Sequence, residues 1–318
     1  MAMRKFLRKV FCHLSFALLL TAGKVIGSPS ENDSVFLFTS FHDADQKYLR
    51  FLYSYDGLHW TNVPGIFLTA KVGTNQQLRD PSLTRGPDGV FQLVWTTGWH
   101  GDQGFGYANS ADLIHWSDQK FIPVMTNEPT TVNVWAPEIF YNSTDKQFII
   151  TWAATIPGRF PDLLERRDNN HRLYCTTTRD FKDFAPTKLF YDPGFSVIDP
   201  FILHAGTGYV LLLKDNSRPR LNLRVAFGDS PLGPWKGLSP PLTQKYAEGP
   251  CALKTGPDWL VYFDAYRDKK FGVLRTLDFQ TFTDASPESF FPPDHKHGTA
   301  IPVPRLILNG LLQLANQH

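Results

Sequence analysis

The sequence predicts an all-β fold, a five-bladed β-propeller whose ring is closed by N- and C-terminal strands that share a blade. The first observation is a repeat, in which a strand, a turn rich in Asp, Gly or Pro and an aromatic residue recur five times. The second is that helical periodicity is nearly absent and ambiguous only over 306–314. Short strands repeated in fixed order, roughly 50–60 residues apart, are typical of propellers with four-stranded blades.

Each repeat contains three parts, which we expect to be successive strands of a blade. The repeats end at the aromatic residues Trp60, Trp116, Phe184, Trp235 and Phe282. An apolar strand precedes each of them, at 35–41, 90–96, 148–153, 209–213 and 259–263. The innermost strands are expected at 80–83, 136–140, 199–202, 248–253 and 297–301. Because the last inner strand comes at the end of the chain and 35–41 at its start, both ends would complete one blade and remove an open sheet edge.

The N-terminal segment has the pattern of an export signal. Residues 1–9 are basic, residues 10–22 are mostly apolar, and small residues follow at Gly27 and Ser28. We expect a signal peptide over 1–27, a single propeller domain over 28–318, and export to the periplasm, the cell surface or the medium. A retained anchor is the alternative, although the apolar run is shorter than the roughly 20 residues of a spanning helix. No later stretch predicts a membrane span.

Charge argues against a nucleic-acid partner. The chain has 32 basic and 30 acidic residues, and five basic residues but no acid lie in the first 27. The rest therefore carries 27 basic and 30 acidic residues, without the clustered basic charge that nucleic acids require. We expect a monomer. The two cysteines after the signal, Cys175 and Cys251, could form a disulfide, but buried free thiols are favoured.

Acidic residues stand at or near the start of four of the five expected inner strands. They are Asp80, Glu138, Asp199 and Glu248, and His297 stands in the fifth. The inner strands of a propeller line its central channel, so the ring would bring these side chains together. Crowded carboxylates shift one another's pKa values, so that one can serve as an acid and another as a base. Two such groups flanking a glycosidic bond are the usual machinery of sugar hydrolysis.

Four short motifs in this order resemble glycoside hydrolase family 43. They are Asp80-Pro, Trp135-Ala-Pro-Glu138, Ile198-Asp-Pro200 and Glu248-Gly-Pro250. The resemblance covers residues 34–305 and implies a five-bladed propeller of inverting enzymes, mostly α-L-arabinofuranosidases, β-xylosidases and arabinanases. It implies a carbohydrate substrate and the removal of a terminal furanose, with α-L-arabinofuranose the expected sugar.

The resemblance also implies residue roles. Asp80 matches the general base, and Glu248 matches the general acid, whose pKa should be raised so that it keeps its proton. Asp199 matches the carboxylate that tunes the pKa of the acid and orients it. His297 matches an axial histidine that in some members contacts calcium or a water-filled cavity. No cofactor is required, and a structural calcium near His297 is an open alternative to a satisfied polar residue.

Four further residues are candidates for the site. Trp135 and Trp99 are expected to form walls of the sugar site, with packing in the core as the alternative. Arg267 is expected to bind sugar hydroxyls. Glu138, two residues beyond the expected axial position, is expected to support the catalytic groups rather than act on the substrate.

Several alternatives stay open. Within the family these are a β-D-galactofuranosidase and a β-xylosidase. Sucrose- and fructan-cleaving propellers carry Asn-Asp-Pro-Asn-Gly and Glu-Cys motifs, whereas this chain has Arg79-Asp-Pro-Ser82 and Glu248-Gly-Pro250. A sugar-binding propeller without catalysis would be expected to lose an acid, and all three acids are present.

Overall fold

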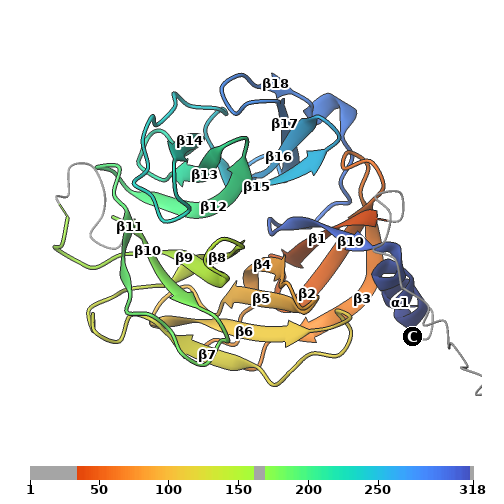
Figure 1. Ribbon diagram of the computed structural model, residues 1–318, viewed down its shortest axis with the longest axis horizontal. Coiled ribbons are helices and arrows are strands. Elements are labelled where there is room, and N and C mark those ends of the chain that lie inside the picture. The colour runs from red at the N-terminus through yellow and green to blue at the C-terminus, as the bar shows by residue number, and fades with distance from the viewer. Residues whose placement is uncertain (1–33, 161–168, 316–318) are drawn as a thin grey trace, which may run out of the picture.

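Five antiparallel sheets stand around a central axis and form a five-bladed β-propeller (Figure 1). The computed structural model describes residues 34–160 and 169–315. The blade that joins the chain ends contains β19 (Ala300–Pro304), β1 (Ser34–His42), β2 (Asp45–Ser54) and β3 (Thr61–Thr69). Two blades follow, with β4 (Arg79–Arg85), β5 (Phe91–Thr96), β6 (Gly104–Ser110) and β7 (Lys120–Pro123), then β8 (Trp135–Asn142), β9 (Gln147–Ala154), β10 (Arg172–Thr178) and β11 (Lys188–Tyr191). The last two contain β12 (Val197–Ala205), β13 (Gly208–Asp215) and β14 (Asn222–Gly228), then β15 (Ala247–Thr255), β16 (Asp258–Ala265), β17 (Lys270–Thr276) and β18 (Thr283–Asp284).

The two ends of the chain close the ring in one blade, as the repeat predicts. β19 is the innermost strand of that blade and pairs antiparallel with β1, so that Ser34 lies opposite Pro304 and Phe38 opposite Ala300. A short 3-10 helix, η2 (Ser286–Glu288), precedes β19. The closure matters for the site because it places His297, just before β19, beside the inner strands of the other blades.

The stretch that is ambiguous in the sequence folds as a helix. Helix α1 (Arg305–Ala315) follows β19 directly and packs beside β3, at the outer side of the shared blade (Figure 1). Its apolar face buries Leu308 and Leu311. Within the described residues, no helix is long and apolar enough to cross a membrane.

The repeated aromatic residues pack the blades, as their repetition predicts. Trp60 is 1% exposed, stacks on Phe291 and meets Phe38 edge-on. The Nε1–H of Trp60 donates to the carbonyl oxygen of Gly57 at 3.0 Å, which ties the aromatic residue to its own turn. Cys175 and Cys251 are buried and unpaired, as expected. The expected signal peptide over 1–27 lies outside the described residues.

Candidate active site

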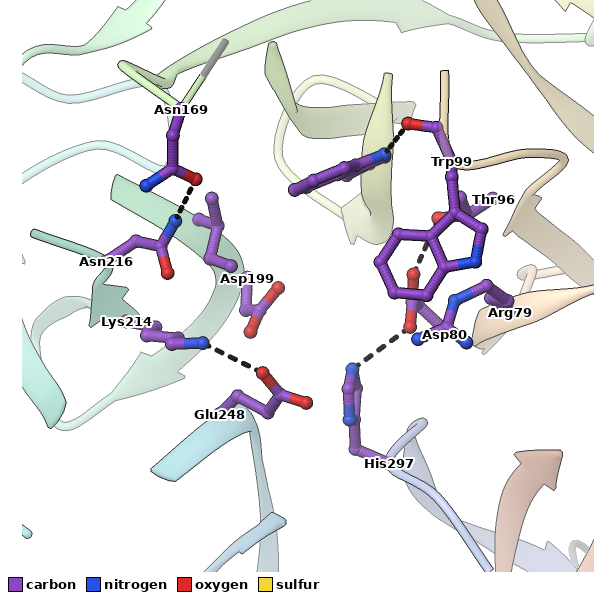
Figure 2. A pocket seen from close by; sticks show the side chains of 12 residues that line it. Arg79, Asp80, Thr96, Trp99, Asn169, Asp199, Lys214, Asn216, Glu248 and His297 are labelled. Carbon is purple, nitrogen blue, oxygen red and sulfur yellow. Dashed lines mark hydrogen bonds and ion pairs between the residues drawn. The ribbon is translucent and has the colours of Figure 1, made fainter. Parts of the chain in front are cut away.

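A cavity of about 150 Å³ lies at the axis, where the inner strands converge (Figure 2). Three predicted carboxylates line it, Asp80 from β4, Asp199 from β12 and Glu248 from β15. The other lining residues are Arg79, Thr96, Trp99, Trp135, Asn169, Ile198, Lys214, Asn216 and His297. Asp80 and Glu248 point into the cavity from opposite sides (Figure 2). The ring therefore brings together acids that are far apart in the sequence.

A β-bulge at the start of each of four inner strands aims these side chains. The pairing register shifts at β4, β8, β12 and β15, each time across the proline motif. The residue before each proline has a positive φ: 49° at Asp80, 46° at Ala136, 53° at Asp199 and 57° at Gly249. Bulges are frequent beside active sites because they turn a side chain out of the regular ladder. Asp80 and Asp199 are presented to the cavity in this way.

The second inner strand, β8, carries no carboxylate at the matching position. Ala136 stands there, and Glu138 lies farther along the axis in a separate cavity of about 20 Å³, which has room for about one water. Burial raises the pKa of Glu138 to about 8, although a hydrogen bond with Ser82 opposes the shift. Glu138 does not line the main cavity, and its supporting role stays a prediction.

Asp80 is held as an ionised carboxylate. The Oγ1–H of Thr96 donates to its Oδ2 at 2.7 Å, and the Nε2 of His297 lies 3.1 Å from its Oδ1. Burial by itself raises the pKa of Asp80, but the contacts with His297 and the charge of Arg79 lower it to about 2. A general base must be ionised, so the surroundings of Asp80 suit the predicted role.

Glu248 differs from expectation. The Nζ of Lys214 lies 2.8 Å from its Oε2. Burial raises the pKa of Glu248, but the charges of Lys214 and His297 outweigh burial and lower it below its ordinary value. The expectation that Glu248 itself has a raised pKa is therefore wrong for the free site, because it left out a buried ammonium group.

Asp199 has the raised pKa instead. Burial is the main cause and takes its pKa to about 6, although His297 and Lys214 oppose the shift. Its Oδ2 accepts a hydrogen bond from the backbone N–H of Gly249 at 2.9 Å, directly beside Glu248. The two carboxylates interact, so their protons belong to the pair rather than to either residue. Below a pH of about 6 the pair holds one proton, and the opposite directions of the two pKa shifts favour Asp199 over Glu248 as its site.

His297 bridges two acids. Its Nε2 contacts Asp80 at 3.1 Å, and its Nδ1 lies 3.7 Å from the Oδ2 of Asp264. Burial lowers the pKa of His297, but the interactions with Asp264 and Asp80 raise it well above its usual value. The ring therefore carries a positive charge at neutral pH and stabilises the ionised form of Asp80.

The surroundings of His297 also bear on calcium. Ligand atoms of Glu248, Asp264 and His297 lie within 4.8 Å of one another. However, Lys214 already pairs with Glu248, and the Nζ of Lys296 lies 3.0 Å from Asp264. Calcium prefers six to eight oxygen ligands, and a histidine must be neutral to bind a metal. The negative charges of Glu248 and Asp264 are thus balanced by lysine side chains, and this set of donors does not fit a calcium site.

The close packing of Gly249 against His297 can be tested by substitution. A Cβ at Gly249 would lie 2.0 Å from the Cγ of His297, at a φ of 57°. Gly256 has nearly the same φ, 58°, but open space around it, which makes it a matched control. We expect Gly249→Ala to lower the free energy of unfolding by about 2 kcal/mol more than Gly256→Ala, since overpacking costs roughly 1–3 kcal/mol. Urea unfolding of both variants measures the difference, and equal losses would contradict the packing described.

Trp99 and Trp135 both line the cavity. The Nε1–H of Trp135 donates to the backbone carbonyl oxygen of Trp99 at 2.7 Å, and the rings meet edge-on at 5.7 Å. Trp99 is 44% exposed, and the guanidinium of Arg79 lies 4.0 Å from the centre of its ring. Both residues therefore lie at the cavity, and their sugar-binding role stays a prediction. Arg267 does not line this cavity and lies in a neighbouring one.

Sequence reasoning missed two cations at the site. Arg79 stands directly before Asp80 in the inner-strand motif, and Lys214 directly follows the expected apolar strand 209–213. A buried lysine at the end of such a strand is a signal in itself, because a buried charge requires a partner. Lys214 comes from the second strand of its blade, however, whereas the acidic motifs lie on the inner strands.

A family model described as a probable glycosyl hydrolase domain, of the family-43-related type, matches residues 31–306. The chain belongs to this family. Among curated proteins, none matches it by sequence.

Solved structures share the propeller of this family-43-related domain. An α-L-arabinofuranosidase from Lactobacillus brevis has a TM-score of 0.52 and 16% identity over 66% of this chain and 72% of that one. An α-L-arabinanase from Cellvibrio cellulosa, complexed with arabinohexaose, has a TM-score of 0.55 and 16% identity over 78% and 89%. A family 117 glycoside hydrolase from the marine bacterium Zobellia galactanivorans has a TM-score of 0.52 and 16% identity over 66% and 69%. At this identity the likeness concerns the fold alone, which serves more than one glycoside hydrolase family.

Proposed function

We propose that this protein is an inverting glycoside hydrolase that removes a terminal α-L-arabinofuranose from an oligosaccharide or polysaccharide. The observation that carries the proposal is the cavity between ionised Asp80 and the interacting pair of Asp199 and Glu248. A volume of about 150 Å³ is smaller than the roughly 300–1,000 Å³ of pockets for drug-sized ligands, which suits one sugar unit. Family membership supports hydrolysis of a glycoside, and the names of two structural relatives favour arabinose.

The reaction needs one proton removed and one delivered. Asp80 accepts a proton from water as the water oxygen bonds to the anomeric carbon. The bond from that carbon to the leaving oxygen breaks, and Glu248 gives the leaving oxygen a proton. Since the two groups approach from opposite sides of the cavity, water would attack the face opposite the leaving group, which inverts the configuration (Figure 2).

The proton that Glu248 delivers would come from its pair with Asp199. In the free site Lys214 favours ionised Glu248, so below a pH of about 6, where the pair holds a proton, Asp199 binds it more strongly. A substrate oxygen that contacts Glu248 would favour the protonated form there. Asp199 would thus hold the proton and orient the acid, consistent with the role that the family resemblance implies.

This arrangement predicts the pH dependence of kcat/KM. The pair must keep one proton, so activity should fall tenfold per pH unit above about 6. Asp80 must be ionised, and its pKa of about 2 leaves activity unaffected by Asp80 down to strongly acidic pH. Lys214→Met removes a charge that lowers the pKa of the pair, so the descending limb should move up by about 1 unit or more.

The pH profiles of wild type, Lys214→Met and Lys236→Gln test this prediction. Lys236 is exposed and lies outside the cavity, so its variant should keep the wild-type profile. A descending limb that stays in place in Lys214→Met would contradict the assigned proton pair.

Hydrolysis of aryl glycosides tests the proposed function. The panel contains α-L-arabinofuranoside, β-D-galactofuranoside, β-D-xyloside and β-fructoside. We expect the first to be cleaved fastest, and a faster galactofuranoside or xyloside would change the sugar but keep the mechanism. If none of these substrates is cleaved but the protein binds sugar, the non-catalytic alternative is favoured.

Export and a monomeric state stay predictions. Detection of the protein outside the cytoplasm would test export, and sedimentation would test the monomeric state.

A further inference from the structure

A second, larger cavity adjoins the candidate active site. Its volume is about 440 Å³, and it shares Asn169 and Asn216 with the first cavity. The side chains of Tyr246, Tyr266, Lys245 and Arg267 also line it. The shared residues make the two cavities neighbours, so a ligand in the first could extend into the second.

The second cavity lies on the side of the proposed general acid. The Nζ of Lys214 lies 4.9 Å from the centre of the Tyr266 ring and 2.8 Å from the Oε2 of Glu248. A general acid protonates the oxygen of the leaving group. If the proposed function holds, the second cavity is therefore where the leaving saccharide lies.

Among the described residues that line this cavity there are cations and no carboxylate. The Nζ of Lys245 lies 5.1 Å from the centre of the Tyr246 ring, and the Cζ of Arg267 lies 4.7 Å from it. Among the residues that the structure describes, no carboxylate forms an ion pair with either cation. In the first cavity, by contrast, Lys214 is paired with Glu248. Two cations without an acidic partner favour an anionic ligand.

The backbone holds the aromatic wall in place. The N–H of Tyr246 donates to the carbonyl oxygen of Leu221 at 2.7 Å, and the N–H of Tyr266 donates to the carbonyl oxygen of Tyr246 at 3.2 Å. The two rings meet edge-on at 5.8 Å. Tyr246 has a φ of 74°, an uncommon conformation for a bulky residue that is found at ligand-binding sites. This wall fixes the surface on which Lys245 and Arg267 lie.

We propose that the second cavity is a subsite for an acidic leaving-group sugar, which carries a carboxylate or a sulfate ester. Lys245 and Arg267 would bind the anionic group through charge-assisted hydrogen bonds. Tyr246 and Tyr266 would contact the apolar face of the sugar ring. The substrate class is then a terminal furanose attached to a uronic acid or to a sulfated sugar.

Three disaccharides with the same furanose test the subsite. Their leaving sugars are galactose, galacturonic acid and galactose 6-sulfate. At low salt, we expect kcat/KM for at least one acidic substrate to exceed that for the neutral one about tenfold, as two partly screened ion pairs allow. The preference should be lost in Lys245→Gln/Arg267→Gln and retained in Lys236→Gln, a matched cation outside both cavities. Whichever acidic substrate is preferred identifies the anionic group.

Two outcomes would overturn the inference: equal cleavage of neutral and acidic disaccharides by wild type, or a preference that survives the double variant. An aryl furanoside has no leaving sugar to occupy the second cavity, so its cleavage tests the proposed function alone. If it is cleaved but the disaccharides show no acidic preference, the subsite inference fails and the proposed function stands. If no furanoside is cleaved, calorimetric titration with a galacturonic acid oligosaccharide replaces kinetics. Binding that weakens about tenfold in the double variant supports the subsite, whereas equal or absent binding contradicts it.

Discussion

Asp80→Asn is expected to lower kcat/KM on an α-L-arabinofuranoside about 10³-fold, within the range that general acid–base groups contribute. Asparagine keeps the shape of the side chain but cannot accept the proton of the attacking water. The loss should be the same for a dinitrophenyl leaving group and for a sugar, because both reactions need the same water. Initial rates at several substrate concentrations measure the loss.

Asp43→Asn is the matched control for this variant. Asp43 also contacts Arg79, with its Oδ1 3.3 Å from Nη1, but is half exposed and does not line the cavity. Its removal should change kcat/KM only a few-fold. An Asp80→Asn enzyme that keeps a tenth or more of wild-type activity would show that another group activates the water.

Glu248→Gln is expected to have an effect that depends on the leaving group. For a sugar leaving group kcat/KM should fall about 10³-fold, because an alkoxide leaves poorly without a proton. For a dinitrophenyl group the loss should be about tenfold or less, since the phenolate is stable without protonation. Steady-state kinetics on both substrates measure the two losses. Equal losses would mean that Glu248 positions the substrate and that another group supplies the proton.

Much of the fold could be predicted because the blades of a propeller repeat the same sequence pattern. The turn and aromatic residue of each repeat, such as Trp60, serve local packing that every blade needs. Closure followed from the phase of the repeat, which places 297–301 and 35–41 in one blade. Asp80 and Asp199 could be found because a proline motif marks the bulge that presents them.

Other features of the site could not be predicted, because they depend on side chains from neighbouring strands. Lys214 reaches Glu248 from the second strand of the adjacent blade, and this contact reverses the expected pKa shift of the acid. Charge balance around His297 depends on Lys296 and Asp264, which no motif connects. Arg267 lines the neighbouring cavity rather than the first, since its place depends on how a loop folds against Tyr246.

The most direct test of the central claim is the stereochemistry of the sugar released. Proton NMR can follow hydrolysis of an α-L-arabinofuranosyl disaccharide and identify the first anomer formed, before it equilibrates in water. The geometry of Asp80 and Glu248 predicts that β-L-arabinofuranose appears first. Release of the α anomer first would require a covalent intermediate and would contradict the assignment of Asp80 as a base that activates water.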